Sequence, residues 1–312
     1  MENWIKETAV AGLEGFRIGH AQNEEAKTGV TVLLFDRGAR VGVDISGGGP
    51  ASRETPLTSP LTADNPVNAI VLSGGSAFGL AAGDGVMRYL EERGIGFDTG
   101  YAKVPLVCQS CIYDLGIGRA DIRPDQAMGY AACVAAENKD CRSGSVGGGT
   151  GATVGKLCGM ERSMKSGIGI HAVSIGALWM AAVVVVNALG DIYNPHTGQK
   201  IAGLLKADRQ GFADTCQELY RLSQRTDLFR GNTTIGAVVT NGRFSKGEMN
   251  KIASMTRNAY ARCIRPVGTM ADGDTIYAAS VGEVEADINM AGTLSADVMA
   301  QAIQKAVLLP PV

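Results

Sequence analysis

A short polar segment, Arg230-Gly231-Asn232-Thr233-Thr234, leads directly into the apolar residues 235–239. A peptide bond that precedes Thr can break by an N→O acyl shift, in which the hydroxyl attacks the preceding carbonyl and forms an ester that water then hydrolyses. The products here would be a C-terminal Asn232 and a new N-terminal Thr233. The free α-amine of such a Thr has a pKa of about 8 and can act as the base for its own hydroxyl. Gly-Asn and Thr are also common where an ordinary turn enters a strand, so that interpretation stays open.

Four further side chains could support such chemistry. Lys156 follows a run of Gly and Thr and stands among apolar residues. Burial would lower its pKa and let it help to activate a hydroxyl, whereas a surface Lys would have no such role. Asn187 ends an apolar stretch of valines, where its amide could donate to an oxyanion or cap the following turn. Asp272 and Asp274 flank a single Gly and could hold an amine, a metal ion or the ammonium of the nucleophile, or could form an ordinary Asp-Gly turn.

Other catalytic and metal-binding patterns are incomplete. Residues 150–157 lack the first Gly and the final Ser or Thr of a phosphate-binding loop, so they offer no magnesium ligand. Residues 73–79 lack the first Gly of a nucleophile elbow. Cys108 and Cys111 form one Cys-x-x-Cys without a second pair, a pattern that we interpret as core thiols. The histidines have no metal-binding spacing and stand at His20, His171 and His196. We therefore expect no metal ion and no cofactor.

The composition excludes several classes of partner. The chain has 312 residues and a net charge of −2, and no basic stripe of the kind that binds nucleic acid. The N-terminal residues lack the cationic and apolar regions of a signal peptide. The longest apolar run, residues 177–189, is interrupted by Asn187 and is too short to cross a bilayer. The seven scattered cysteines suit a reducing compartment. We expect a cytoplasmic protein that binds neither nucleic acid nor membranes.

Strand-like and helix-like segments alternate along the whole chain, without a long linker or an internal repeat. This pattern predicts a single domain over residues 1–312, with an α/β layered fold and mixed sheets. Short apolar runs, several of them rich in β-branched residues, predict strands over residues 31–35, 40–45, 69–72, 168–175, 178–186, 234–240 and 275–280. Apolar periodicity predicts helices over a segment that ends near residue 93 and over residues 125–138, 201–225, 245–263 and 295–308.

Taken together, the motifs resemble those of the L-aminopeptidase/D-Ala-esterase/amidase family, also called the P1 family, which includes β-aminopeptidases and nylon-oligomer hydrolases. The similarity covers nearly the whole chain and keeps the order of the motifs. It includes Gly19-His20, Thr28-Gly-Val-Thr-Val32, Asp44-Ile-Ser-Gly-Gly-Gly-Pro50, Leu72-Ser-Gly-Gly-Ser-Ala-Phe-Gly-Leu80, Ile112-Tyr-Asp-Leu-Gly116, Gly149-Thr-Gly-Ala-Thr-Val-Gly-Lys156, Asn187-Ala-Leu-Gly-Asp191, Asn232-Thr-Thr-Ile235 and Asp272-Gly-Asp-Thr275.

The resemblance implies a four-layer αββα sandwich, similar in layering to the N-terminal-nucleophile hydrolases but different in connectivity. It implies a precursor that cuts itself at Asn232-Thr233 into fragments 1–232 and 233–312. Thr233 would then be the N-terminal nucleophile, and its amine, helped by Lys156, would be the base. Asn187 and Tyr113 would bind the oxyanion or orient the substrate. The cleaved pairs would assemble as a homotetramer.

The resemblance also bears on the substrate. Asp272 and Asp274 would lie near Thr233 and steer it or the amino group of the substrate. Peptide-cleaving members tend to carry Ser and Glu at these two positions, and the pair of Asp residues is more similar to the nylon-oligomer hydrolase branch. The implied function is hydrolysis of small peptides or amino-acid amides, with ω-amino-acid oligomers as a further candidate class. The alternative is an acyltransferase of the ornithine acetyltransferase type, which also cuts before Thr but passes the acyl group to an amine.

Overall fold

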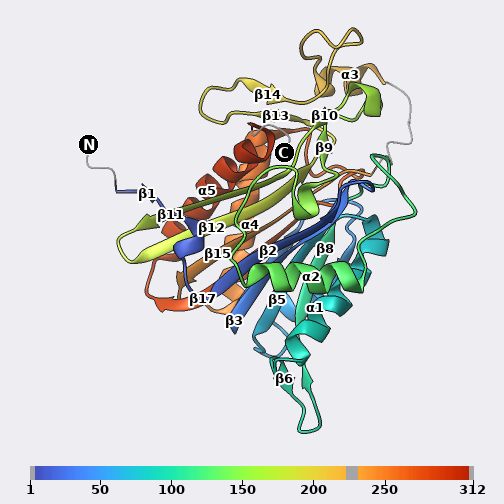
Figure 1. The fold of residues 1–312 in the computed structure, drawn as a ribbon. Coiled ribbons are helices and arrows are strands. Elements are labelled where there is room, and N and C mark those ends of the chain that lie inside the picture. Colours follow the sequence, from blue (N-terminus) through green and yellow to red (C-terminus); the bar gives the residue numbers. More distant parts are fainter. Residues whose placement is uncertain (1–3, 223–230, 309–312) are drawn as a thin grey trace.

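One long strand connects two sheets. The computed structural model describes residues 4–222 and 231–308. The strand β3 (Thr28–Ile45) pairs through its first half with β2 (Phe16–Asn23) and β5 (Val67–Ser73). Its second half pairs with β17 (Thr275–Val284), so it continues from one sheet into the other (Figure 1).

The strands run in mixed directions, with both parallel and antiparallel pairs. Along the path the order is β1-β11-β12-β15-β17-β3-β5-β8-β4, and β2 pairs with β3 beside it. β15 runs parallel to β17 and β5 parallel to β8, whereas the other pairs are antiparallel. The strands not yet placed are β1 (Lys6–Glu7), β4 (Ser52–Arg53), β8 (Val107–Cys111), β11 (Ile168–Ile175), β12 (Leu178–Asn187) and β15 (Thr233–Gly242).

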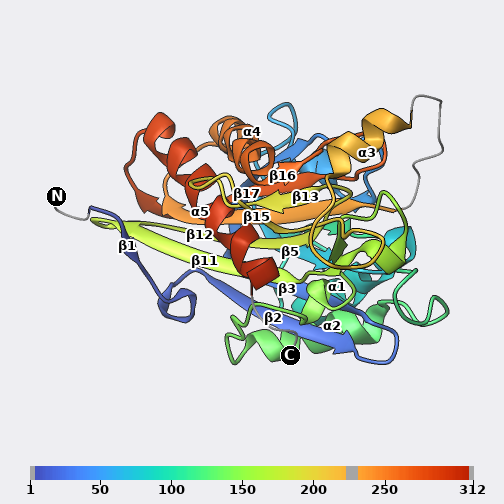
Figure 2. The same ribbon diagram turned by 90° about the horizontal axis from the view of Figure 1, so that it is seen from above.

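Helices cover the outer face of each sheet. α4 (Lys246–Cys263) and α5 (Ile288–Leu308) lie on the sheet of β12, β15 and β17, and α1 (Ala82–Glu91) and α2 (Gln126–Ala136) lie on the sheet of β2, β3 and β5 (Figure 2). Side chains alternate between the faces of each strand. On β12, Val184 and Val186 therefore pack with α4 and α5, while Val183 and Val185 pack between the two sheets. The predicted αββα layering is confirmed.

Short elements complete the chain. The short strands are β6 (Phe97–Asp98), β7 (Lys103–Val104), β9 (Thr153–Val154), β10 (Met164–Lys165), β13 (Asp191–Tyr193), β14 (Lys200–Ala202) and β16 (Ile264–Arg265). The 3-10 helices are η1 (Val10–Gly12), η2 (Thr55–Thr58), η3 (Ser76–Ala81), η4 (Gly147–Gly149) and η5 (Met160–Arg162), and the remaining α-helix is α3 (Thr215–Arg221).

Three predicted elements differ from the structure. The predicted helix over residues 201–225 is wrong for most of its described length, because β14 occupies its start and α3 covers only seven residues of it; residues 223–225 lie outside the described part. The cause is Asp191, whose buried carboxylate accepts from Leu204 N at 2.7 Å, from Thr215 N at 2.9 Å and from Lys200 Nζ at 2.6 Å. The two strands predicted over 31–35 and 40–45 are one strand, β3, with an irregular register where it passes between the sheets.

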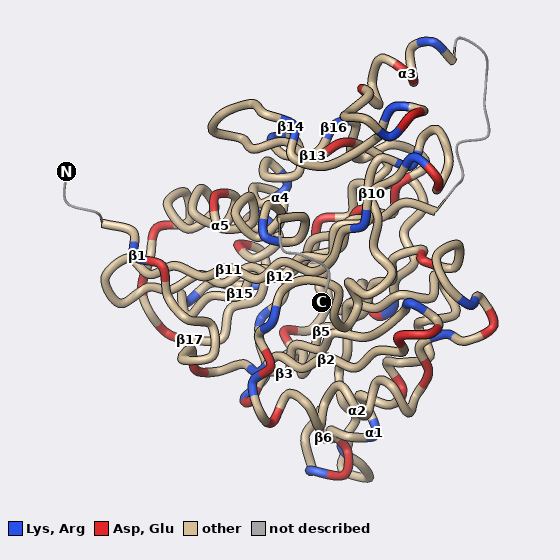
Figure 3. Tube along the Cα trace, turned by 45° about the horizontal axis from the view of Figure 1, so that its top comes forward, with Lys and Arg blue, Asp and Glu red and all other residues tan. Residues whose placement is uncertain are grey.

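The surface carries both signs of charge. Basic and acidic residues alternate over much of the chain trace (Figure 3). Among the helices that the structure describes, none has the length and apolar character needed to cross a membrane.

Candidate active site

The predicted site residues gather where three strands begin or end. β12 ends at Asn187 and β15 begins at Thr233, and these two residues are paired in the antiparallel ladder. Asp272, just before β17, forms a bridge with Asn232. Lys156 reaches the same place from the loop after β9 and donates to Asn187. The structure describes Asn232 and Thr233 as consecutive residues of one chain.

The hydroxyl of Thr233 faces the carbonyl that precedes it. Oγ1 of Thr233 donates a hydrogen bond to the carbonyl oxygen of Asn232. The same oxygen accepts from the backbone N–H of Gly273 at 3.0 Å. Only Gly suits position 273, because a Cβ there would lie 2.8 Å from Oγ1 of Thr233 and 2.6 Å from the carbonyl oxygen of Gly49. The hydroxyl oxygen of Thr233, the carbonyl of Asn232 and the backbone donor of Gly273 are therefore in contact.

Lys156 is a buried amine beside the carbonyl of Gly231. Its Nζ donates to the carbonyl oxygen of Asn187 at 2.9 Å, to Oδ1 of Asn187 at 2.8 Å and to the carbonyl oxygen of Gly231 at 3.2 Å. Burial lowers the pKa of Lys156 to about 7, although the nearby Asp272, Asp114 and Asp274 oppose the shift. An amine with such a pKa is partly neutral near pH 7, as a general base requires.

Asn187 connects the parts of the site. Its Oδ1 accepts from the backbone N–H of Thr153 at 3.1 Å as well as from Lys156. Its Nδ2 donates to the carbonyl oxygen of Tyr113 at 3.0 Å and lies 3.5 Å from the carbonyl oxygen of Gly231. The side chain is fully buried, and both ends of its amide are paired, as buried polar groups usually are. Asn187 thus faces the carbonyl of Gly231, one residue before the Asn232-Thr233 peptide bond.

The two carboxylates hold the loop that supplies Gly273. Oδ2 of Asp272 accepts from the N–H of Thr269 at 3.0 Å and from its hydroxyl at 2.6 Å. Asp274 accepts from the N–H of Thr234 at 2.7 Å through Oδ1 and from the N–H of Gly268 at 2.9 Å through Oδ2. Burial raises the pKa of both carboxyl groups, and the charge of Asp272 raises that of Asp274 further. Asp274 therefore holds the backbone of Thr234, the residue that follows Thr233, in place.

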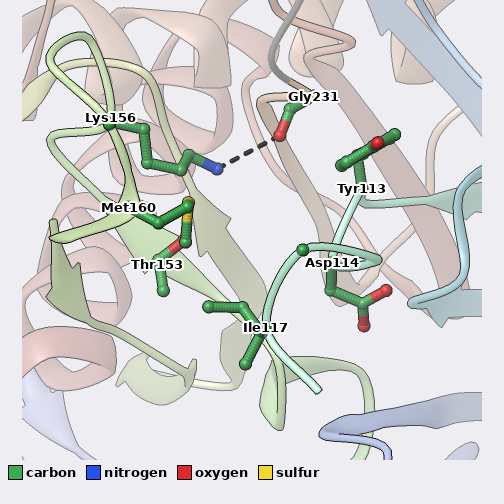
Figure 4. A pocket seen from close by; sticks show the side chains of 9 residues that line it. Tyr113, Asp114, Ile117, Thr153, Lys156, Met160 and Gly231 are labelled. Atoms are coloured by element: carbon green, nitrogen blue, oxygen red, sulfur yellow. Dashed lines mark hydrogen bonds between the residues drawn. The ribbon is translucent and has the colours of Figure 1, made fainter. Parts of the chain in front are cut away.

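A cavity opens beside Gly231 (Figure 4). It has a volume of about 300 Å³. Its lining consists of Tyr113, Asp114, Gly116, Ile117, Thr153, Lys156, Gly159, Met160 and Gly231. A small acyl group has room there, in reach of Lys156. Within residues 4–222 and 231–308, no group of three or more His, Cys, Asp or Glu side chains is placed to hold a metal ion.

Two residues that contribute to this site were not singled out from the sequence. Gly273 contributes its backbone N–H, and such a donor cannot be recognised from the residue type in the sequence. Asp114 is buried at the cavity wall, and its carboxylate accepts from the N–H of Gly75 at 2.7 Å and from the hydroxyl of Thr28 at 2.7 Å. Burial raises the pKa of Asp114. The motif that drew attention to Tyr113 includes Asp114, but its partners Thr28 and Gly75 are far away in the sequence.

Comparison with known proteins defines the class. The model of peptidase family S58 matches residues 8–309. An uncharacterized aminopeptidase of Mycobacterium tuberculosis (strain ATCC 25618 / H37Rv) is 35% identical over 331 aligned positions, which cover 96% of this chain and 93% of the relative. A 6-aminohexanoate-oligomer endohydrolase of Agromyces sp. (strain KY5R) is 34% identical, with coverage of 87% of this chain and 74% of the relative.

A solved structure shares the fold. The L-aminopeptidase D-Ala-esterase/amidase from Ochrobactrum anthropi, described as a new variant of the Ntn hydrolase fold, aligns with a TM-score of 0.70 at 16% identity, covering 96% of this chain and 85% of that one. The family match and the named relatives support an amide hydrolase, and the solved structure shows the same layered architecture. The chain belongs to peptidase family S58, which confirms the resemblance inferred from the sequence.

Proposed function

We propose that this chain cleaves itself between Asn232 and Thr233 and then hydrolyses small amides with the N-terminal Thr233 as nucleophile. The observation that carries the proposal is the contact of the Thr233 hydroxyl with the carbonyl oxygen of Asn232, which the N–H of Gly273 also binds. An N→O acyl shift needs these three groups together: an attacking oxygen, a carbonyl, and a donor for the oxyanion.

The self-cleavage step moves one acyl group from nitrogen to oxygen. Oγ1 of Thr233 bonds to the carbonyl carbon of Asn232, and its proton passes to Lys156 in the neutral form, which donates two hydrogen bonds and keeps a lone pair for the proton. The negative charge that develops on the carbonyl oxygen is stabilised by the N–H of Gly273. The C–N bond then breaks, the proton is delivered to the leaving nitrogen, and the acyl group remains on Oγ1 as an ester. Water hydrolyses the ester, which gives the carboxylate of Asn232 and the free amine of Thr233.

Turnover repeats this chemistry on a substrate. The α-amine of Thr233, helped by Lys156, takes the hydroxyl proton as Oγ1 attacks the substrate carbonyl. The N–H of Gly273 occupies the position of an oxyanion donor, while Asn187 and Tyr113 orient the acyl group. Asp272 and Asp274 keep the loop and the start of β15 together. The amine product leaves with the proton, and water releases the acid.

The substrate class follows from the relatives and from the pair of carboxylates. Relatives are named as aminopeptidases and as 6-aminohexanoate-oligomer endohydrolases. We infer that small peptides, amino-acid amides and ω-amino-acid oligomers are hydrolysed. A panel of anilides with L-, D- and β-aminoacyl groups, together with 6-aminohexanoate oligomers, tests this inference with enzyme whose fragments have been identified by intact mass. Absence of hydrolysis throughout the panel would contradict it.

A further inference from the structure

The residues just before the proposed cleavage site occupy a defined place. Gly231 forms one wall of the cavity, and its carbonyl oxygen accepts from Lys156 at 3.2 Å, with Nδ2 of Asn187 at 3.5 Å. In Figure 4 this carbonyl points toward Lys156, and Tyr113 lies on the other side of Gly231. Asn232 is buried, with its carbonyl oxygen bound to the N–H of Gly273.

Self-cleavage and turnover use the same oxygen, so their acyl carbons must reach the same point. In the precursor that carbon belongs to the carbonyl of Asn232, and in turnover it belongs to the substrate. Both become bonded to Oγ1 of Thr233. A substrate can therefore react only after Asn232 has left, and its acyl part enters the space that Gly231 and Asn232 occupied.

The surroundings of Gly231 restrict what fits in that space. Its φ is +65°, and a Cβ at this position would lie 2.0 Å from Cγ and Cδ1 of Tyr113. Such an overlap requires the ring to move, which is costly in a packed site. At the carbonyl, the N–H groups of Lys156 and Asn187 need an acceptor once the precursor segment has gone.

We propose that the acyl part of the substrate repeats the shape of Gly231-Asn232. In the substrates that react fastest, it has an amide carbonyl one residue upstream of the scissile amide, which binds Lys156 and Asn187. It also has an unbranched carbon beside Tyr113. Acyl groups of the glycyl-dipeptide type have both features at this spacing, whereas most α-peptides carry a side chain at the position next to Tyr113. This proposal rests on the proposed function, because it assumes that Thr233 is the nucleophile in both steps.

The test compares two substrates that differ by one methyl group. Acetyl-Gly-Asn p-nitroanilide and acetyl-Ala-Asn p-nitroanilide are assayed with enzyme shown by intact mass to consist of fragments 1–232 and 233–312. We expect kcat/KM for the glycyl substrate to be higher by roughly tenfold or more. Tyr113→Ala should reduce this ratio. Ile117→Ala should leave the ratio unchanged, because Ile117 lines the same cavity but the three atoms nearest a side chain at position 231 all belong to Tyr113.

Three results would overturn the proposal: equal rates for the two substrates, a ratio that Tyr113→Ala does not alter, or no nitroaniline from either substrate with fully cleaved enzyme. Each of these leaves self-cleavage in place. An active enzyme that remains a single chain would instead overturn the proposed function, so the two failures are distinguishable.

Discussion

The backbone nitrogen of Gly273 lies 3.0 Å from the carbonyl oxygen of Asn232, although the two residues are 41 positions apart. The loop held by Asp272 and Asp274 brings this donor to the bond that precedes Thr233. The carboxylates therefore act on the proposed reaction through a backbone group, which they position.

The first prediction concerns Gly273. In Gly273→Ala the new Cβ would meet Oγ1 of Thr233 at 2.8 Å and the carbonyl oxygen of Gly49 at 2.6 Å. We expect self-cleavage to slow by roughly tenfold or more, because an overlap of this size displaces the hydroxyl. Gel densitometry of freshly synthesised chain measures the rate. Gly247→Ala is the control, since a Cβ at Gly247 meets no atom within 4 Å. Normal cleavage of Gly273→Ala would contradict the assigned geometry.

The second prediction concerns pH. Burial lowers the pKa of Lys156 to about 7, so the amine is protonated and unable to accept a proton at lower pH. We expect the rate of self-cleavage to rise with pH up to about 7 and then level off, as measured by pH jumps on precursor from cell-free synthesis. Lys156→Met should slow cleavage by roughly 10²-fold or more and remove the rise. The exposed Lys251, changed to Met, should behave as wild type. An unchanged pH profile in Lys156→Met would exclude Lys156 as the base.

The third prediction concerns Asp274, whose two oxygens accept from the N–H groups of Thr234 and Gly268. Asp274→Asn must place an NH₂ group against one of these donors. We expect the free energy of unfolding to fall by about 1–3 kcal/mol in urea titrations, together with slower cleavage. Asp297→Asn removes only an exposed pair with Arg262 and should change stability by no more than about 0.5 kcal/mol. Wild-type stability of Asp274→Asn would show that these hydrogen bonds are dispensable.

The same variant tests whether the stability of the fold depends on the protonation of Asp274. Because burial raises the pKa of Asp274, the folded state binds a proton more readily than the unfolded state. The contribution of Asp274 to stability is therefore largest at low pH and falls as pH rises from the ordinary pKa of Asp toward the raised value. Asp274→Asn has no titrating group there, so the stability difference between wild type and variant should change across this range. A difference that is constant with pH would contradict the raised pKa.

The fourth prediction separates hydrolysis from acyl transfer. Since the chain belongs to a peptidase family, we expect water to take the acyl group from Thr233. Mass spectrometry of reactions with and without ornithine should show the free acid in both and no acylated ornithine. Accumulation of acylated ornithine would favour the acetyltransferase alternative.

The residue pattern predicted an α/β layered fold with mixed sheets, and the resemblance to the family implied the αββα layering and the grouping of the site residues. Apolar runs rich in β-branched residues predicted β12 and β15, and Asn187 and Thr233 stand at the ends of these strands. The resemblance named Lys156 and the two Asp residues before any contact was known. The cleavage itself, the roles of the residues, the homotetramer and the cytoplasmic location stay predictions.

The features that could not be predicted from the sequence depend on contacts between residues far apart in the chain. The N–H of Gly273 has no signature in the chain, and its role follows only from the bridge between Asn232 and Asp272. The helix over 201–225 was wrong because apolar periodicity does not register Asp191, which binds the backbone at Leu204 and Thr215. Buried polar contacts of this kind override a local pattern.

Intact-mass spectrometry of active enzyme tests the central claim most directly. The account predicts fragments 1–232 and 233–312, with Thr233 at the N-terminus of the smaller one, and a single inactive chain for Thr233→Ala. Thr233→Ser retains a hydroxyl and should still be cut. Catalytic activity in an unbroken polypeptide, or in Thr233→Ala, would contradict the account.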